Sequence, residues 1–210
     1  MGRTGDATTR PMRADARRNR EALLSAAGDA FAERGVDTSL EDIAERAGVG
    51  IATLYRNFPT REVLIQAVYQ AEVARLCAGV DELLATTSPA DALETWTQRF
   101  VAHVGRKRGM ATALKQAVAD AQTPEAAQSH AEMVARSKEQ MRQAITTLVD
   151  AGIADGTVRD DVEPMDLLRS ISGICLTDTG TEPSARMAAL LTDGMRYHAK
   201  RPEGTLDASP

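Results

Sequence analysis

The sequence has few of the residues that support catalysis or metal binding. Aromatic side chains make up only 3% of its 210 residues, and it has eight prolines, three histidines and two cysteines. It has no G-x-S-x-G, H-E-x-x-H, G-x-x-x-x-G-K or G-x-G-x-x-G element, so the corresponding hydrolase, zinc-protease and nucleotide-binding motifs are missing. His103, His130 and His198 have no Cys or carboxylate at ligand spacing, which argues against zinc. We expect no enzyme, cofactor or metal site.

Other scarcities concern location. Cys77 and Cys175 lie far apart in apolar stretches, so we expect buried free thiols in a reducing compartment rather than a disulfide. No apolar stretch approaches the roughly 20 residues that span a bilayer. The N-terminal arginines are not followed by an apolar core, which argues against a signal peptide. We therefore expect a cytoplasmic protein without a membrane partner.

The residues that are abundant predict helices. Apolar residues make up 43% of the chain, alanine dominates them, and no useful length of strand-like alternation occurs. Apolar periodicity, caps and helix breakers predict an all-α fold of about nine helices. The expected helices are 15–34, 39–47, 49–58, one that begins after Thr60, 89–104, 110–121, 124–151, 164–176 and 183–198.

The segment 38–61, TSLEDIAERAGVGIATLYRNFPTR, is typical of two short helices joined by a tight turn. Ser39 can cap the first helix, and Asp42 completes a capping box. Gly48 can adopt the left-handed conformation that ends this helix. In the second helix, Leu54 and Phe58 form the buried side. Such a unit places a helix end in the DNA major groove.

These residues carry a resemblance to the TetR family of transcriptional regulators, whose pattern is T-x-x-x-I-A-x-x-A-G-V-S-x-x-T-x-Y-x-x-F-x-x-K-x-x-L. The similarity covers residues 15 to 65. Two positions differ, because Gly50 stands where the family has Ser, and Arg61 stands where it has Lys. The matching residues are Thr38, Ile43, Ala44, Ala47, Gly48, Val49, Thr53, Tyr55, Phe58 and Leu64.

The resemblance implies which residues meet DNA. Ile51, Ala52, Thr53 and Tyr55 would lie in the groove, where the first two can contact only thymine methyl groups or fit the surface. Thr53 facing solvent and Tyr55 as a packing residue are the alternatives. The residues that would lie near phosphates are Thr38, Ser39, Asn57 and Arg61. Gly50 would cap the second helix. Glu41 would accept a hydrogen bond from a cytosine amine or point away from the DNA.

The charge distribution favours the same end of the chain. The net charge is −5. Residues 1–20 carry six arginines and two aspartates, a local +4, whereas residues 62–210 carry 15 basic and 21 acidic side chains, a local −6. A basic end on an acidic body suits DNA binding, although arginines near the terminus also suit a solvated tail.

The remaining helices suggest a regulatory body. An apolar effector cavity is one interpretation of its bulky residues, and plain core packing is the other. The cavity candidates are Trp96, Phe100, His103, Met110, Met133 and Met141. Apolar faces near the end of the chain predict an isologous four-helix dimer contact. Its candidates are Leu167, Leu168, Ile171, Ile174, Cys175, Met187, Leu190, Leu191 and Met195.

We thus expect an N-terminal arm and DNA-binding domain over 1–60, a helical effector and dimerisation domain over 61–200, and a loose tail over 201–210. The resemblance implies a homodimeric repressor that a small apolar effector releases from a palindromic duplex operator. Two rivals stay open. One is a DNA-binding protein without an effector, with a solidly packed body, and the other is a helical carrier or enzyme.

Overall fold

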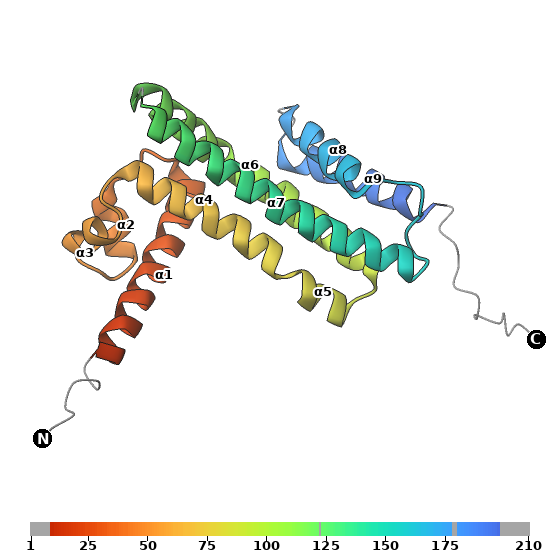
Figure 1. Cartoon of the computed structure of the whole chain (residues 1–210), viewed down its shortest axis with the longest axis horizontal. Coiled ribbons are helices and arrows are strands. Elements are labelled where there is room, and N and C mark those ends of the chain that lie inside the picture. Colours follow the sequence, from red (N-terminus) through yellow and green to blue (C-terminus); the bar gives the residue numbers. More distant parts are fainter. Residues whose placement is uncertain (1–8, 122, 178–179, 198–210) are drawn as a thin grey trace, which may run out of the picture. The chain divides into compact units, whose positions relative to one another are not determined.

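The structure, a computed structural model, is built of helices joined by short connections (Figure 1). It describes residues 9–121, 123–177 and 180–197, and within these ranges it has nine helices and no strand. The all-α prediction is confirmed. The expected tail and His198 lie outside the described residues. The helices are α1 (Thr9–Arg34), α2 (Leu40–Arg46), α3 (Ile51–Asn57), α4 (Arg61–Ala78), α5 (Val80–Thr86), α6 (Pro89–Ala121), α7 (Pro124–Ala154), α8 (Pro164–Leu176) and α9 (Thr181–Arg196).

The largest differences from the expected helix boundaries lie in α1 and α6. The first helix begins at Thr9 rather than near Asp15, so residues 9–14 are helical where a disordered arm was expected. A turn was expected over residues 105–109, but α6 continues through them. A glycine inside a helix costs only about 1 kcal/mol relative to alanine. Burial of Met110 and Leu114, which are 3% and 6% exposed, outweighs that cost and keeps the helix continuous.

The chain forms two compact units that do not follow the expected boundary at residue 60. One unit comprises residues 1–72 and 107–130, and the other comprises residues 73–106 and 131–210. Three helices, α4, α6 and α7, are therefore divided, because one part of each belongs to the first unit and the other part to the second. Apolar periodicity along one helix cannot reveal such a division, because it does not say which partner each part of the helix meets.

The first unit has a core of α1, α2, α3 and α4 side chains. Eight side chains of this unit are no more than 1% exposed, among them Ala30 of α1, Ile43 of α2 and six others. The six others are Leu23, Ala27, Leu54, Phe58, Leu64 and Val68. Lys107 of α6 joins this unit by donating a 2.8 Å hydrogen bond to the hydroxyl of Tyr69 on α4.

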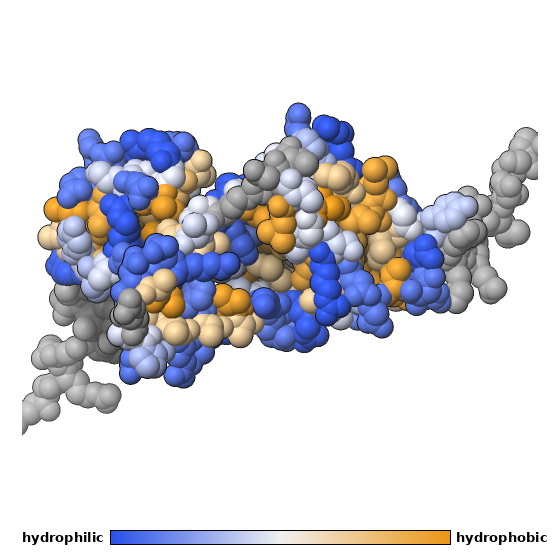
Figure 2. Space-filling view, turned by 90° about the horizontal axis from the view of Figure 1, so that it is seen from above, coloured by the Kyte–Doolittle hydropathy of each residue, from blue (hydrophilic) through white to orange (hydrophobic). Residues whose placement is uncertain are grey.

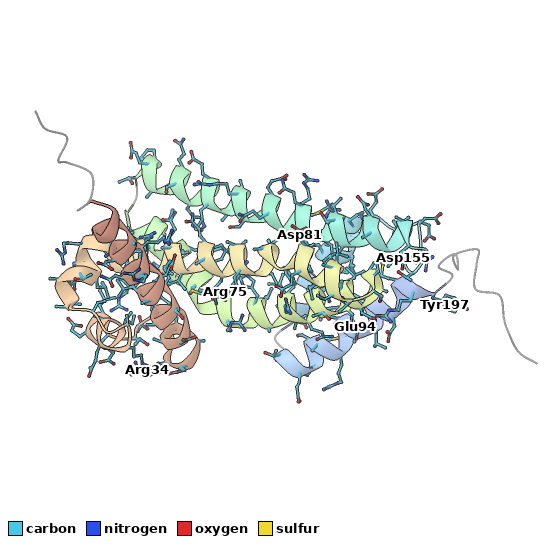
Figure 3. The ribbon with its side chains drawn as sticks, turned by 90° about the horizontal axis from the view of Figure 1, so that it is seen from below. Arg34, Arg75, Asp81, Glu94, Asp155 and Tyr197 are labelled. Carbon is cyan, nitrogen blue, oxygen red and sulfur yellow. The ribbon has the colours of Figure 1, made fainter. Side chains whose placement is uncertain are left out.

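The second unit is centred on Trp96 of α6. Its ring stacks on Phe100 with centroids 5.5 Å apart, and its Nε1 donates a 3.1 Å hydrogen bond to the Leu76 carbonyl. At the end of α9, Arg196 donates to the carboxylates of Asp91 and Glu94, both at 2.9 Å. Glu94 and the C-terminal end of α9 therefore lie together (Figure 3). These contacts hold α9 against the start of α6.

The stretch Arg61–Thr86 is long and apolar enough to cross a membrane by length and composition alone. This finding differs from the expectation that no apolar stretch approaches the length of a bilayer span. Its break at Gly79 divides it into α4 and α5, and Leu64, Val68, Val73 and Leu76 within it are buried. Its apolar character is thus explained by the protein's own core.

Candidate nucleic-acid interface

The two short helices and the tight turn between them form as the sequence predicts. Ser39 precedes α2, and its Oγ accepts the Asp42 N–H at 3.1 Å. Gly48 has a φ of 68°, which an L side chain rarely adopts. The capping box is not completed, since the Asp42 carboxylate accepts a 3.0 Å hydrogen bond from Arg34 of α1. Asp42 therefore ties α2 to α1.

One face of α3 is buried and the other meets solvent. Leu54 and Phe58 are fully buried. Ala52 and Tyr55 are exposed, Tyr55 by 46%, while Ile51 and Thr53 are half-buried. The four residues predicted to enter the groove therefore reach the surface at the start and middle of this helix. Gly50 precedes the helix in an extended conformation, without a side-chain cap.

Arg56 is an exposed residue of α3 that the sequence analysis missed. Its Nη2 donates to Thr53 Oγ1 at 2.8 Å, and its Nε donates to the Ala52 carbonyl at 3.3 Å. A positive charge on the exposed side of this helix was a readable signal. It was overlooked because the family pattern leaves that position free. Asn57 donates to the Thr53 carbonyl at 2.9 Å.

Thr38 and Arg61 have structural roles that the phosphate prediction did not include. Thr38 is 8% exposed, and its hydroxyl donates to the Gly35 carbonyl at 2.8 Å. Its hydroxyl proton is thus used inside the fold, and the expected position of Thr38 near phosphates stays a prediction. Arg61 Nη1 donates to the carbonyls of Val36 and Thr38, at 2.8 and 2.6 Å. Arg61 thus fastens the start of α4 to the α1–α2 turn.

Ser39 and Glu41 lie at the start of α2. The Ser39 hydroxyl donates to the Glu41 carboxylate at 3.4 Å while it caps the helix, and Glu41 is exposed. On α1, the guanidinium of Arg20 lies 4.6 Å from the centre of the Phe58 ring. Arg17 pairs with Glu21 at 3.6 Å. The exposed basic side chains of α1 are thus partly held by local partners.

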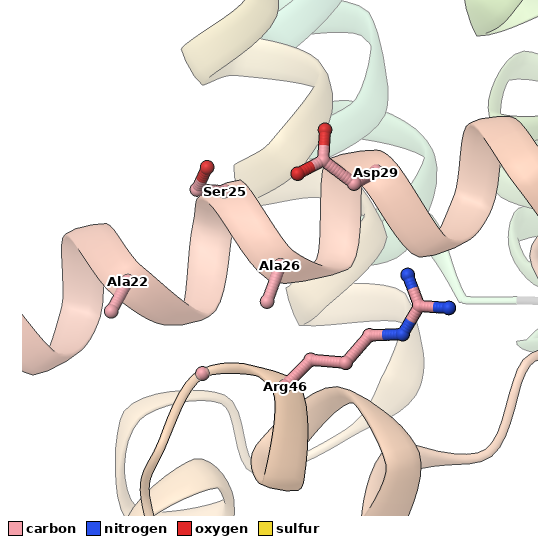
Figure 4. A pocket seen from close by; sticks show the side chains of 6 residues that line it. Ala22, Ser25, Ala26, Asp29 and Arg46 are labelled. Atoms are coloured by element: carbon pink, nitrogen blue, oxygen red, sulfur yellow. The ribbon is translucent and has the colours of Figure 1, made fainter.

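Beside the turn unit of residues 38–61, a hollow lies between α1 and α2 (Figure 4). Its volume is about 420 Å³, and small side chains line most of it. Arg46 extends across it from α2 and pairs with Glu33 at 2.8 Å. The hydrogen bond from Arg46 holds the pKa of the Glu33 carboxyl below its ordinary value. The lining residues are Ala22, Ser25, Ala26, Asp29, Arg46 and Ala47.

A family model described as "Bacterial regulatory proteins, tetR family" matches residues 23–68. A second, described as "Transcriptional regulator SbtR-like, C-terminal domain", matches residues 88–197, which is more than half of the chain. The chain belongs to the TetR family. The resemblance read from the turn unit is thereby confirmed, and the second match extends the family assignment into the region that the sequence motif did not cover.

Solved structures of TetR-family regulators agree with this assignment. The chain is 42% identical to the regulator SCO0520 from Streptomyces coelicolor, covering 84% of this chain and 98% of that one, with a TM-score of 0.73. It is 31% identical to a regulator from Mycobacterium vanbaalenii, covering 89% and 99%, with a TM-score of 0.69. The repressor KstR2 of Mycolicibacterium smegmatis is 29% identical over 69% of either chain. The chain spans only 31% to 41% of the length of other curated regulators that it matches.

In this TetR-family chain, the expected effector residues are all buried. Trp96, Phe100, His103, Met133 and Met141 belong to the second unit, and each is at most 7% exposed. Met110 belongs to the first unit, so the structure does not gather the six into one set. Thr97 was missed. Its side chain is fully buried, and its Oγ1 has no hydrogen-bond partner in the part of the chain that the structure describes.

The expected dimer residues fall into two groups. Leu167, Leu168, Ile171, Cys175 and Met195 are at most 7% exposed, so they are corrected to core residues of the subunit. Ile174, Met187 and Leu191 are half-buried. Leu190 is 71% exposed. Leu176, which was not among the expected residues, is 78% exposed. Hydrophobic side chains reach the surface on the side carrying α8 and α9 (Figure 2).

The Arg61 contacts predict an effect on stability. Arg61→Met removes a charged donor from two carbonyls and should lower the free energy of unfolding by about 1–3 kcal/mol. Arg56→Met, the matched control, removes only bonds within exposed α3 and should change it by less than about 0.5 kcal/mol. Urea titration followed by circular dichroism measures both. Equal stabilities would contradict the structural role of Arg61.

Proposed function

We propose that this chain is a cytoplasmic, homodimeric repressor that binds a two-fold symmetric duplex operator through α3 and is released by a small apolar effector. The observation that most supports this proposal is the exposed face of α3, which presents Thr53, Tyr55 and Arg56. The opposite face of the helix is held in place by the buried side chains of Leu54 and Phe58. The family assignment supports DNA as the partner, and the name of KstR2 supports repression.

The side chains of α3 suit base edges and phosphates. Arg56 can donate to guanine, and the hydroxyls of Thr53 and Tyr55 can donate or accept. Ile51 and Ala52 add apolar surface for thymine methyl groups. Around the helix, the backbone N–H of Gly50 and the side chains of Ser39, Glu41 and Asn57 complete the proposed contact. The positive charge of Arg61 attracts the phosphates. Since phosphate contacts release counterions, affinity should fall steeply with salt.

The dimer contact is proposed for the exposed side of α8 and α9. Leu176 and Leu190 supply apolar surface there. Gly173 and Gly194 are exposed, and a Cβ added to either would meet nothing within 4 Å in the subunit. A helix-interior glycine without an internal reason costs stability, and it permits close approach by a second helix. Two such helices from each subunit would form a four-helix contact.

The effector is proposed to bind in the second unit near Thr97. A buried hydroxyl without a partner costs about 1–3 kcal/mol, and a polar group of a ligand would remove that cost. The stacked rings of Trp96 and Phe100 and the thioethers of Met133 and Met141 supply apolar surface in the same unit. An effector would bind more tightly to a conformation in which the DNA-binding units of the two subunits lie at a separation that does not match the operator. This difference in affinity would lower DNA binding.

The DNA contact predicts the effect of a double substitution. Thr53→Ala with Tyr55→Ala should weaken binding to an operator selected from genomic fragments by about thirtyfold or more, since each of the two base contacts contributes about 1–3 kcal/mol. Helicity and dimerisation should stay unchanged. Tyr197→Ala, which also removes an exposed tyrosine, is the control and should bind like the parent. Parental affinity in the double variant, measured by fluorescence anisotropy, would place the interface elsewhere.

The α8–α9 surface predicts two different outcomes for the same chemical change. Leu176→Glu with Leu190→Glu should give folded monomers, because the new charges face the partner. Ile171→Glu places an unpaired charge in the subunit core and should cost about 3 kcal/mol or more of stability. Sedimentation and thermal unfolding distinguish them. An intact dimer in the double variant would move the contact away from this surface.

The unpaired hydroxyl predicts a gain in stability. Thr97→Val should raise the free energy of unfolding by about 1 kcal/mol, because the buried polar atom disappears without a loss of volume. In the control, Thr192→Val, the hydroxyl donates to the Ala189 carbonyl at 2.9 Å and is also buried, so stability should fall. Thr97→Val should also weaken the effector that releases the operator. A destabilised Thr97→Val protein would favour a solid body without an effector site.

A further inference from the structure

A second hollow lies where the start of α4 meets the end of α6 and the start of α7. Its volume is about 190 Å³. All of its lining residues belong to the first compact unit, and none is among the proposed effector residues of the second unit. The lining consists of Glu62, Val63, Gln66, Leu114, Ala117, Val118, Ala126, Ser129 and His130.

The lining combines an apolar floor with one acid. Leu114 is 6% exposed, and Ala117, Val118 and Ala126 are half-buried. Glu62 is the one carboxylate among the nine residues, and none of the nine is Lys or Arg. The neighbouring Arg61 is occupied by the carbonyls of Val36 and Thr38. The hollow therefore offers a negative charge beside apolar surface.

The acid is ionised at neutral pH. The Thr60 hydroxyl hydrogen-bonds to the Glu62 carboxylate, and this bond, more than any other cause, holds the pKa of Glu62 below its ordinary value. The same Thr60 Oγ1 accepts the Val63 N–H at 3.3 Å. Thr60 thus fixes the carboxylate at the first turn of α4, at the edge of the hollow.

We propose that this hollow is a second, regulatory binding site for a small organic ammonium compound. The ammonium group pairs with the Glu62 carboxylate, and the apolar part lies on Leu114 and Val118. Gln66, Ser129 and His130 offer further hydrogen-bonding groups. The volume is below the roughly 300–1,000 Å³ of sites for drug-sized ligands, so the ligand is a compact monoamine with an apolar body rather than a long chain.

A ligand in the hollow affects the position of the turn unit through the first turn of α4. Glu62 follows Arg61, whose guanidinium holds the α1–α2 turn through Val36 and Thr38. A ligand that draws Glu62 toward α6 and α7 therefore biases the position of Arg61 and of the turn unit. This regulatory role rests on the proposed DNA-binding function, whereas binding of the amine itself does not.

Binding is tested by calorimetry on the full chain with three probes of similar shape. Benzylamine is cationic, benzyl alcohol is neutral and benzoate is anionic. Benzylamine should bind saturably and at least tenfold more tightly than the other two. Glu62→Gln should weaken benzylamine about tenfold, while Glu82→Gln, the same change at an exposed acid of α5 in the other unit, should leave it unchanged. Equal binding of amine and alcohol overturns the proposal.

A steric variant tests the location independently of charge. Ala126→Leu fills the hollow and keeps Glu62, so it should also weaken benzylamine about tenfold while the thermal midpoint stays near that of the parent. If neither Glu62→Gln nor Ala126→Leu affects binding, or if benzylamine does not bind, the site assignment is wrong. For Glu62→Gln, thermal unfolding and circular dichroism confirm a folded protein.

Operator affinity with and without saturating benzylamine tests the regulatory role. We expect a change of at least threefold that is lost in Glu62→Gln and in Ala126→Leu. An unchanged affinity in the presence of bound amine overturns the regulation. If the chain binds no duplex at all, the proposed function fails, and the calorimetric result still decides whether the hollow takes an amine.

Discussion

The burial of Leu54 and Phe58 is the constraint on which the proposed interface depends. A helix of seven residues is not stable alone, so α3 exists because its inner side chains are fully excluded from water against neighbouring helices of the first unit, α2 among them. Gly48 supplies the reversal that brings α3 onto them. Fixing one face of the helix necessarily fixes the other. The orientation of Tyr55 and Arg56 toward solvent is therefore a consequence of core packing.

Within the first compact unit, the charged residues of the first turn of α4 face different helices. Arg61 and Glu62 are adjacent, but their partners differ. Arg61 binds the carbonyls of the α1–α2 turn, while Glu62 borders a hollow formed with α6 and α7. Hydrogen bonds to a charged group contribute about 1.5–3 kcal/mol each, so the two contacts of Arg61 are costly to break. This junction can thus relate events at α6 and α7 to the position of α3.

The second unit has a buried core, but a few of its groups cost stability within the single subunit. Trp96, Phe100 and the methionines fill it, yet Thr97 has a buried hydroxyl without a partner among the described residues. Two exposed leucines and two exposed glycines lie on α8 and α9. Features that cost stability within one subunit have a physical reason when a ligand or a second subunit removes the cost. Both proposals for this unit follow from that argument.

Local patterns were sufficient for the all-α class, most helix positions, the Ser39 cap, the Gly48 turn and the family, because caps, breakers and periodicity act within a few residues. They could not distinguish two apolar faces of one helix. Ile171 and Leu190 both fit an interface by periodicity, but only tertiary packing buries the first and exposes the second. The continuity of α6, the division into two units and the partners of Arg61 were likewise decided by contacts distant in sequence. Such contacts depend on how helices assemble, which no short stretch of the chain specifies.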